Sequence, residues 1–140
     1  MAVRIGEFSI DCSDPIAAAE FWCAALSYRI TDQDDTGVAI AGDSSAPTIL
    51  LLATSDVKAH KNRLHFDVCP VDTTQSEEVL RLERLGARRV DIGQGGDVSW
   101  VVMEDPVGNE FCVMRTVLPP EPEPFHHLDE AHSDDEEDRE

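Results

Sequence analysis

The amino-acid sequence predicts an α+β fold that consists of two tandem β-α-β-β-β modules. The first observation is an internal repeat, because a shift of 58 positions aligns residues 8–14 with residues 66–72. In both copies the strand pattern is followed by an aspartate where a helix N-cap belongs. The second observation is that one helical pattern and three short extended segments follow each copy. We therefore expect a curved, incompletely closed mixed sheet with the helices outside and a ligand in its concavity.

Both helices are predicted from apolar residues at three- and four-residue steps. The first helix, over 15–26, follows Asp14 and has Pro15 at its first position. Its expected buried face consists of Ile16, Ala19, Trp22, Cys23 and Leu26. The second helix, over 73–85, follows the N-cap Asp72 and ends at Gly86. Its expected buried face consists of Val79, Leu82 and Leu85.

The strands that follow each helix are predicted from short apolar runs separated by turn-forming residues. The clearest turn is Asp105-Pro106-Val107-Gly108, because proline presets one dihedral angle and glycine accepts a positive φ. We expect this turn to set the direction of the final strand. The predicted strands are 28–31, 37–41 and 48–53 in the first module and 87–92, 98–103 and 109–116 in the second.

The length and the charge distribution indicate one domain with an acidic tail. A chain of 140 residues, 41% hydrophobic, is long enough for one core, so we expect a domain over 1–117, with modules at 3–54 and 62–117. Residues 119–140 carry ten acidic residues and one arginine, and we expect 118–140 to be disordered. A solubilising tail is the simplest interpretation, although its three histidines leave open a role with divalent metals or a basic partner.

Charge and hydropathy exclude several classes of partner. The net charge of −18 would repel a phosphate backbone, so nucleic acid is not expected. The sequence contains neither an apolar run long enough to span a membrane nor the pattern of a signal peptide, so we expect a cytoplasmic protein without membrane contact. The four cysteines form no C-x-x-C pair and are expected to be reduced and mostly buried.

Several motifs in the same order resemble the vicinal oxygen chelate superfamily, and within it the glyoxalase-like group that is related to glyoxalase I, bleomycin-resistance proteins and extradiol dioxygenases. The resemblance covers residues 3–117 and implies the glyoxalase/bleomycin-resistance fold. The motifs are Asp14-Pro15-Ile16-Ala17-Ala18-Ala19-Glu20-Phe21-Trp22, Lys61-Asn62-Arg63-Leu64-His65-Phe66-Asp67, Leu85-Gly86-Ala87 and Asp105-Pro106-Val107-Gly108-Asn109-Glu110-Phe111.

The resemblance implies positions for the ligands of a divalent metal such as Zn, Fe, Mn or Ni. The ligand positions on the first strands are Glu7 and His65, each seven residues before the aspartate of its copy. On the last strand the position is Cys112, with Glu110 as a substitute on the same face. The segment 48–53 offers no acid, imidazole or thiol, so the usual set is incomplete. A thiol flanked by Phe111 and Val113, as Cys112 is, is more often a small core residue than a metal ligand.

Further residues are expected to contact a ligand or to act on it. His65 and Glu110 are the candidate catalytic residues, and Asp67 lies on the same side as His65 and could fix its tautomer. The candidate ligand-binding residues are Trp100, Asp67 and Phe111, whereas Trp22 is expected in the core. Lys58, Lys61 and Arg63 form a small basic cluster that could attract an anion, although a solvated linker explains it as well.

Two functions follow from these expectations. One is a protein that holds a small oxygen-rich or aromatic metabolite without metal, as drug-sequestering members do, and such members are usually dimers with grooves between the chains. The other is a metal-dependent lyase, isomerase or dioxygenase that uses His65 with Glu7, Glu110 or Cys112. The incomplete ligand set favours the first.

Overall fold

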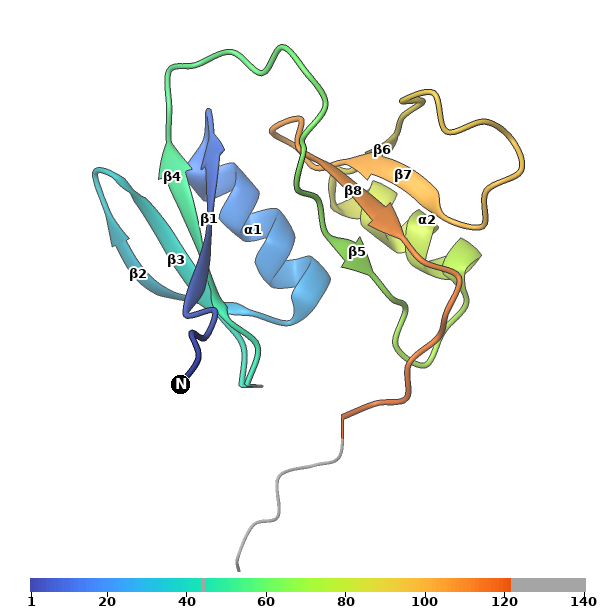
Figure 1. Cartoon of the computed structure of the whole chain (residues 1–140), viewed down its shortest axis with the longest axis horizontal. Helices are drawn as coiled ribbons and strands as arrows, with labels where there is room; N and C mark the ends of the chain where they lie inside the picture. Colours follow the sequence, from blue (N-terminus) through green and yellow to red (C-terminus); the bar gives the residue numbers. More distant parts are fainter. Residues whose placement is uncertain (44, 122–140) are drawn as a thin grey trace, which may run out of the picture.

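The structure is a computed structural model that describes residues 1–43 and 45–121. These residues form two modules, each with one helix and one four-stranded sheet (Figure 1). The first module contains β1 (Glu7–Cys12), α1 (Pro15–Leu26), β2 (Arg29–Asp34), β3 (Gly37–Ala41) and β4 (Thr48–Ala53). The second contains β5 (Asp67–Val68), α2 (Gln75–Leu85), β6 (Arg88–Arg89), β7 (Val101–Glu104) and β8 (Glu110–Val113).

The two sheets have the same topology. Their strand orders are β1-β4-β3-β2 and β5-β8-β7-β6, with one parallel pair at the edge and antiparallel pairs beyond it. In the parallel pairs, Ser9 lies opposite Leu50 and Asp67 lies opposite Cys112. The predicted α+β fold of two β-α-β-β-β modules with mixed sheets and no closed barrel is therefore confirmed.

The two helices begin and end for identifiable reasons. The Asp14 side chain accepts a hydrogen bond from the Ala17 amide, which confirms the predicted N-cap of α1. For α2 the predicted N-cap Asp72 is wrong, since the cap is Thr74, whose hydroxyl accepts from the Glu77 amide. Asp72 instead has a φ of 54°, in the left-handed region and not in the extended conformation that is typical of an N-cap. Gly86 ends α2 with a φ of 116°, as expected.

The strands of the second module are shorter than predicted. The regions expected as strands at 87–92 and 98–103 are paired only in β6 and β7. Between them, two glycines with positive φ, Gly93 and Gly95, turn the chain away from the sheet, and the side chain of Gln94 bonds the local backbone instead.

Helix α1 lies between its own sheet and the second module (Figure 1). Trp22 packs edge-on against Phe66 and Phe111, with ring centroids 5.5 and 4.9 Å away, and Phe21 contacts Phe111. The buried residues of α1 are therefore Ala18, Ala19, Phe21 and Trp22. The expectation for Ile16 is wrong, because half of that residue is exposed and the buried face is rotated toward the second module.

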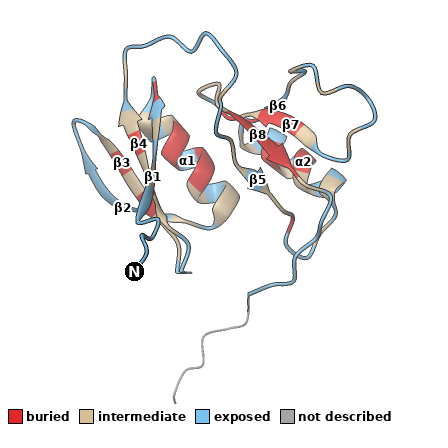
Figure 2. Cartoon of the chain, in the orientation of Figure 1, coloured by how far each residue is buried: buried red, intermediate tan, exposed pale blue. Residues whose placement is uncertain are grey.

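Buried positions gather on α1 and on the middle strands of both sheets (Figure 2). All four cysteines are free thiols, of which Cys12 and Cys112 are buried. Beyond β8, Leu118 still forms a backbone bridge with Val71. The rest of the acidic tail, from residue 122, lies outside the described residues. Neither helix of the described part combines the length and the apolar character needed to cross a membrane.

Arg81 of α2 caps the end of α1, and this contact supports a prediction. Its guanidinium donates to the carbonyl oxygens of Ala24 and Ala25, at 3.1 and 3.0 Å, and pairs with Glu78. These carbonyl oxygens have no hydrogen-bond donor inside α1, and the positive charge of Arg81 interacts favourably with the negative end of the helix dipole. Arg81→Ala is expected to lower the free energy of unfolding by about 1 kcal/mol, as measured by urea denaturation.

The matched control for this prediction is Arg84→Ala, because within residues 1–43 and 45–121 the side chain of Arg84 bonds only the Leu80 carbonyl of its own helix. That variant is expected to change stability by about half as much or less. Equal losses in the two variants would show that helix propensity, and not the contact between the helices, sets the effect.

Candidate functional site

A cavity of about 290 Å³ lies where the two modules meet. Residues 8–11 of β1 form one wall, and residues 62–66, which lead into β5, form the opposite wall. The apolar part of the lining is Phe8, Ile10, Trp22, Leu64 and Phe66, and the polar part is Ser9, Asp11, Asn62, Arg63, His65, Asp105, Asn109 and Glu110. An apolar wall with a few polar groups is the usual composition of a small-molecule site.

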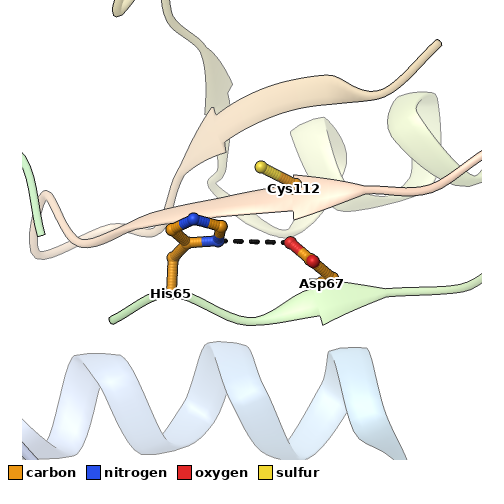
Figure 3. Close-up of side chains that lie close together, drawn as sticks. All are labelled: His65, Asp67 and Cys112. Carbon is orange, nitrogen blue, oxygen red and sulfur yellow. Dashed lines mark hydrogen bonds and ion pairs between the residues drawn. The ribbon is translucent and has the colours of Figure 1, made fainter. Parts of the chain in front are cut away.

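His65, Asp67 and Cys112 form a compact group on one face of the second sheet (Figure 3). The Nδ1 atom of His65 lies 3.2 Å from Oδ1 of Asp67, which sets the orientation of the ring. Asp67 and Cys112 are opposite each other in the β5–β8 pair, so that their side chains share a face. Burial raises the pKa of the Cys112 thiol, and the carboxylate of Asp67 raises it further.

Glu110 is buried and already has two partners. Lys58 donates to its Oε1 at 2.6 Å, and the Asn62 amide donates to its Oε2 at 3.0 Å. Burial alone would raise the pKa of Glu110, but the hydrogen bonds from Lys58 and Asn62 outweigh burial and hold the pKa below its usual value. Because Lys58 and Asn62 belong to the linker between the modules, Glu110 fastens this linker to β8 and shapes one side of the cavity.

Asp105, which also lines the cavity, connects the modules. Its Oδ2 accepts from Nε1 of Trp22 at 2.9 Å, and its Oδ1 accepts from the amides of Val107 and Asn109 in the turn before β8. Only 4% of the residue is exposed, and this burial raises the pKa of its carboxyl group, although the hydrogen bonds oppose the rise.

The structure brings some of the predicted site residues together and places others elsewhere. His65 and Glu110 both line the cavity, and Asp67 and Cys112 join His65 in the compact group. Glu7 and Trp100 are exposed and are not among the residues that line the cavity. Phe111 is 1% exposed and packs in the aromatic core against Phe21 and Trp22, on the opposite face of β8 from Cys112.

Five polar lining residues were not singled out from the sequence for a site, namely Ser9, Asp11, Asn62, Asp105 and Asn109. For Asn62 the only signal was its place in the motif before His65, and Asn109 follows the glycine of the last turn. The side chains of these two asparagines bond each other at 3.0 Å across 47 positions, which no local pattern shows.

The metal set that combines ligands from both modules does not fit this chain. Among the described residues, Glu7 does not belong to the group of possible ligands around His65 and Cys112. The strand β4 supplies no acid, imidazole or thiol, and Glu110 is held by Lys58 and Asn62. The side chains that do converge come from the second module alone.

Comparisons with known proteins agree with the fold. Residues 7–114 match the model of the Glyoxalase-like domain family. No curated protein matches the sequence. Several solved structures resemble this one. They include a possible glyoxalase from Bacillus cereus (TM-score 0.60, 18% identity, 81% of this chain and 99% of that chain), the fosfomycin resistance protein FosX from Mesorhizobium loti (0.61, 13%, 84% and 95%) and TnmS3, an antibiotic binding protein from Streptomyces sp. CB03234 (0.55, 16%, 86% and 98%).

At these identities the solved structures establish the fold, whereas the family model covers most of the chain. Its match includes both copies of the repeat and every strand of the two sheets. The chain belongs to the glyoxalase-like domain family of the vicinal oxygen chelate superfamily.

Proposed function

We propose that this protein binds a small oxygen-rich or aromatic metabolite in the cavity between its modules. This binding does not use a metal ion held by ligands from both modules. The observation that carries this proposal is the cavity of about 290 Å³, which has Phe8, Trp22 and Phe66 in its wall and His65 among its polar groups. This volume lies near the lower limit for ligand sites, so a small ligand fits best. An aromatic ring would stack on the wall, and its oxygen atoms would face donors such as Asn62 and His65.

One of the structural neighbours supports a sequestering role, because its name describes antibiotic binding. FosX is a fosfomycin resistance protein and TnmS3 is an antibiotic binding protein, and both share the fold over more than four fifths of this chain. A sequestering protein needs shape and contacts but no reacting group, which suits a cavity whose two buried acids, Asp105 and Glu110, are already bonded. We also propose that this protein, as a sequestering protein, is a homodimer. Sedimentation velocity would detect the dimer as a mass of twice 15.4 kDa.

The binding test uses the two tryptophans of the chain, because Trp22 lines the cavity and Trp100 does not. In Trp100→Phe protein, fluorescence reports Trp22 alone. Titration with catechol, an aromatic probe, and with fosfomycin, a small oxygen-rich probe, is expected to give a saturable change for at least one of them. Ser9→Leu, which adds bulk at a lining residue, is expected to weaken that binding by about tenfold or more.

Ser76→Leu is the matched control, because Ser76 is exposed on α2 and is not among the residues that line the cavity. Its affinity is expected to equal that of the parent. Equal affinity in Ser9→Leu, or no saturable change with either probe, would count against binding in this cavity.

A second candidate function is a metal-dependent lyase, isomerase or dioxygenase that uses His65. The observation in its favour is the contact with Asp67, which orients the imidazole as a metal ligand or a base requires. Metal analysis of protein purified without chelator separates the two candidates. Stoichiometric metal that is lost in His65→Ala supports the enzyme, and protein free of metal in both cases supports sequestration.

A further inference from the structure

A second hollow, with a volume of about 990 Å³, lies between the C-terminal end of α1, the helix α2 and the segment 68–73 that joins β5 to α2. We call it the helix groove. Among the described residues, only Trp22 lines both this groove and the ligand cavity, so the two are separate. An apolar hollow on a protein surface marks a place where another segment or molecule packs. The apolar residues that line the groove are Trp22, Leu26, Tyr28, Val68, Val71 and Leu82.

The last described residues lie at the edge of the helix groove. The amide of Leu118 donates to the carbonyl oxygen of Pro70 at 2.8 Å, and the carbonyl oxygen of Leu118 accepts from the Asp72 amide at 3.0 Å. The chain thus leaves the second module beside the segment that precedes α2 (Figure 1). Pro120 and Glu121 then line the groove themselves. The residues that follow Glu121 therefore start at the groove and not at a distant point of the surface.

The sequence after Glu121 has two large apolar residues, and both are close to the groove along the chain. Phe125 and Leu128 follow Glu121 by four and seven positions. An extended chain spans about 3.3–3.6 Å per residue, so Phe125 can reach any point within about 14 Å of Glu121. Because this tether is short, its closure costs little entropy, and the effective concentration of the apolar side chains at the groove is in about the millimolar range.

Charge decides which part of the tail can occupy the helix groove. Four acidic and two basic residues line the groove, namely Asp43, Glu77, Glu78, Glu121, Arg81 and Arg84. Of the ten acidic residues in 119–140, eight lie in 129–140 and only Glu123 lies in 122–128. A groove with an excess of acidic residues repels the stretch 129–140, whereas 122–128 combines both apolar side chains with little charge.

We propose that residues 122–128 pack back into the helix groove, with Phe125 and Leu128 as apolar anchors, and that the acidic stretch 129–140 stays in solvent. The packed segment covers apolar side chains at the groove, among them Val71, which is 54% exposed in the described chain. It also covers Cys69, a partly exposed thiol in the lining. The tail thereby becomes a third element that joins α1 to α2.

The experiment is disulfide trapping in the full chain, with Cys69 as the reporter in the groove. Every variant carries Cys23→Ser, which removes the other partly exposed thiol, because Cys12 and Cys112 are buried. His126→Cys then introduces a thiol between the two apolar anchors and leaves both in place. With oxidised glutathione as the oxidant, we expect a disulfide to Cys69 within one chain, which non-reducing electrophoresis and peptide mass spectrometry detect.

His132→Cys is the matched control, because it introduces the same thiol in the same tail beyond the proposed segment. Positions 126 and 132 lie 8 and 14 residues after Leu118, the last residue with a backbone bond to the segment beside the groove. For a tail without docking, effective concentration falls as about the −3/2 power of length, so position 126 would react only about two- to threefold faster. Docking is expected to make it react about tenfold faster or more.

The apolar anchors provide the second comparison. Adding Phe125→Ser and Leu128→Ser to His126→Cys is expected to slow the trapping to within about two- to threefold of the rate of His132→Cys, because the segment loses its apolar contacts. Far-ultraviolet circular dichroism verifies that each variant is folded. These substitutions lie outside the ligand cavity, so the result does not depend on the proposed function.

Three results would overturn the proposal. The first is a rate for His126→Cys within about threefold of that for His132→Cys, which is the behaviour of a tail without docking. The second is fast trapping that persists after both anchors are replaced by serine. The third is a disulfide that forms only between two chains, at a rate that rises with protein concentration, because a second copy would then occupy the groove.

Discussion

Replacing Asp105 with alanine is expected to lower the free energy of unfolding by about 3 kcal/mol. The substitution removes the acceptor of three hydrogen bonds, from Nε1 of Trp22 and from the amides of Val107 and Asn109. The indole group is the costly one, because Trp22 is only 2% exposed and its Nε1 donor loses its acceptor at a buried position. Urea denaturation followed by circular dichroism measures the loss.

A double-mutant cycle with Trp22→Phe isolates the contact between the modules. In a Trp22→Phe background no indole donor is left unpaired, so Asp105→Ala is expected to cost about 1–2 kcal/mol less than in the wild type. Asp97→Ala is the control for loss of an acidic residue, because Asp97 is exposed in the glycine-rich turn. Purely additive losses in the cycle would mean that the bond between Trp22 and Asp105 does not contribute to holding the modules together.

The sequence predicted the fold well wherever the signal was local or repeated. Asp14 and Pro15 fixed the start of α1, and glycine and proline runs fixed the strands Gly37–Ala41 and Thr48–Ala53, which have the predicted bounds. The repeat predicted that both modules have the same topology, because both copies show the same order of strands and helix in the sequence.

Errors arose where contacts between the modules override local patterns. The periodicity of α1 placed Ile16 in the core, but the second module approaches the helix from another side and buries Phe21. The same approach packs Phe111 among aromatic rings, and its expected contact with a ligand stays a prediction. A helix that packs on two sheets has a wider buried face than periodicity against one sheet predicts.

The candidate site was predictable only in part for the same reason. Period-two alternation placed His65 and Asp67 on one side of a strand, and the structure gives them a contact at 3.2 Å. That Cys112 lies opposite Asp67 depends on the register of the β5–β8 pair, which no local pattern specifies. The bonds of Glu110 with Lys58 and Asn62 span 52 and 48 positions and depend on the path of the linker.

Glu110→Gln is expected to lower the free energy of unfolding by about 2 kcal/mol near neutral pH. It removes the carboxylate that pairs with Lys58, and it leaves one acceptor oxygen for two donors, Lys58 and the Asn62 amide. The side chains of Glu110 and Lys58 are 7% and 28% exposed, so solvent screens their attraction only in part. The faster exchange of the Asn62 amide hydrogen would show that the linker has loosened, since this amide donates to Glu110.

The pH dependence of that loss separates the charge from the shape of the side chain. The pKa of Glu110 in the folded chain is lower than its reference value of 4.5, so its ionised form stabilises the fold above that pH. As the pH falls through the lowered pKa, the carboxylate takes up a proton and the stabilisation disappears. The difference between wild type and Glu110→Gln is therefore expected to shrink between about pH 5 and about pH 3.

Two further variants complete this test. Lys58→Met leaves the buried Glu110 with the Asn62 amide alone, so it should destabilise at neutral pH and show the same decline of the effect in acid. Glu20→Gln removes an exposed carboxylate from α1 and should give a small, constant offset. A loss in Glu110→Gln that stays constant down to about pH 3 would mean that the charge of Glu110 contributes nothing and that the loss comes from the hydrogen bond that the glutamine NH2 group cannot accept.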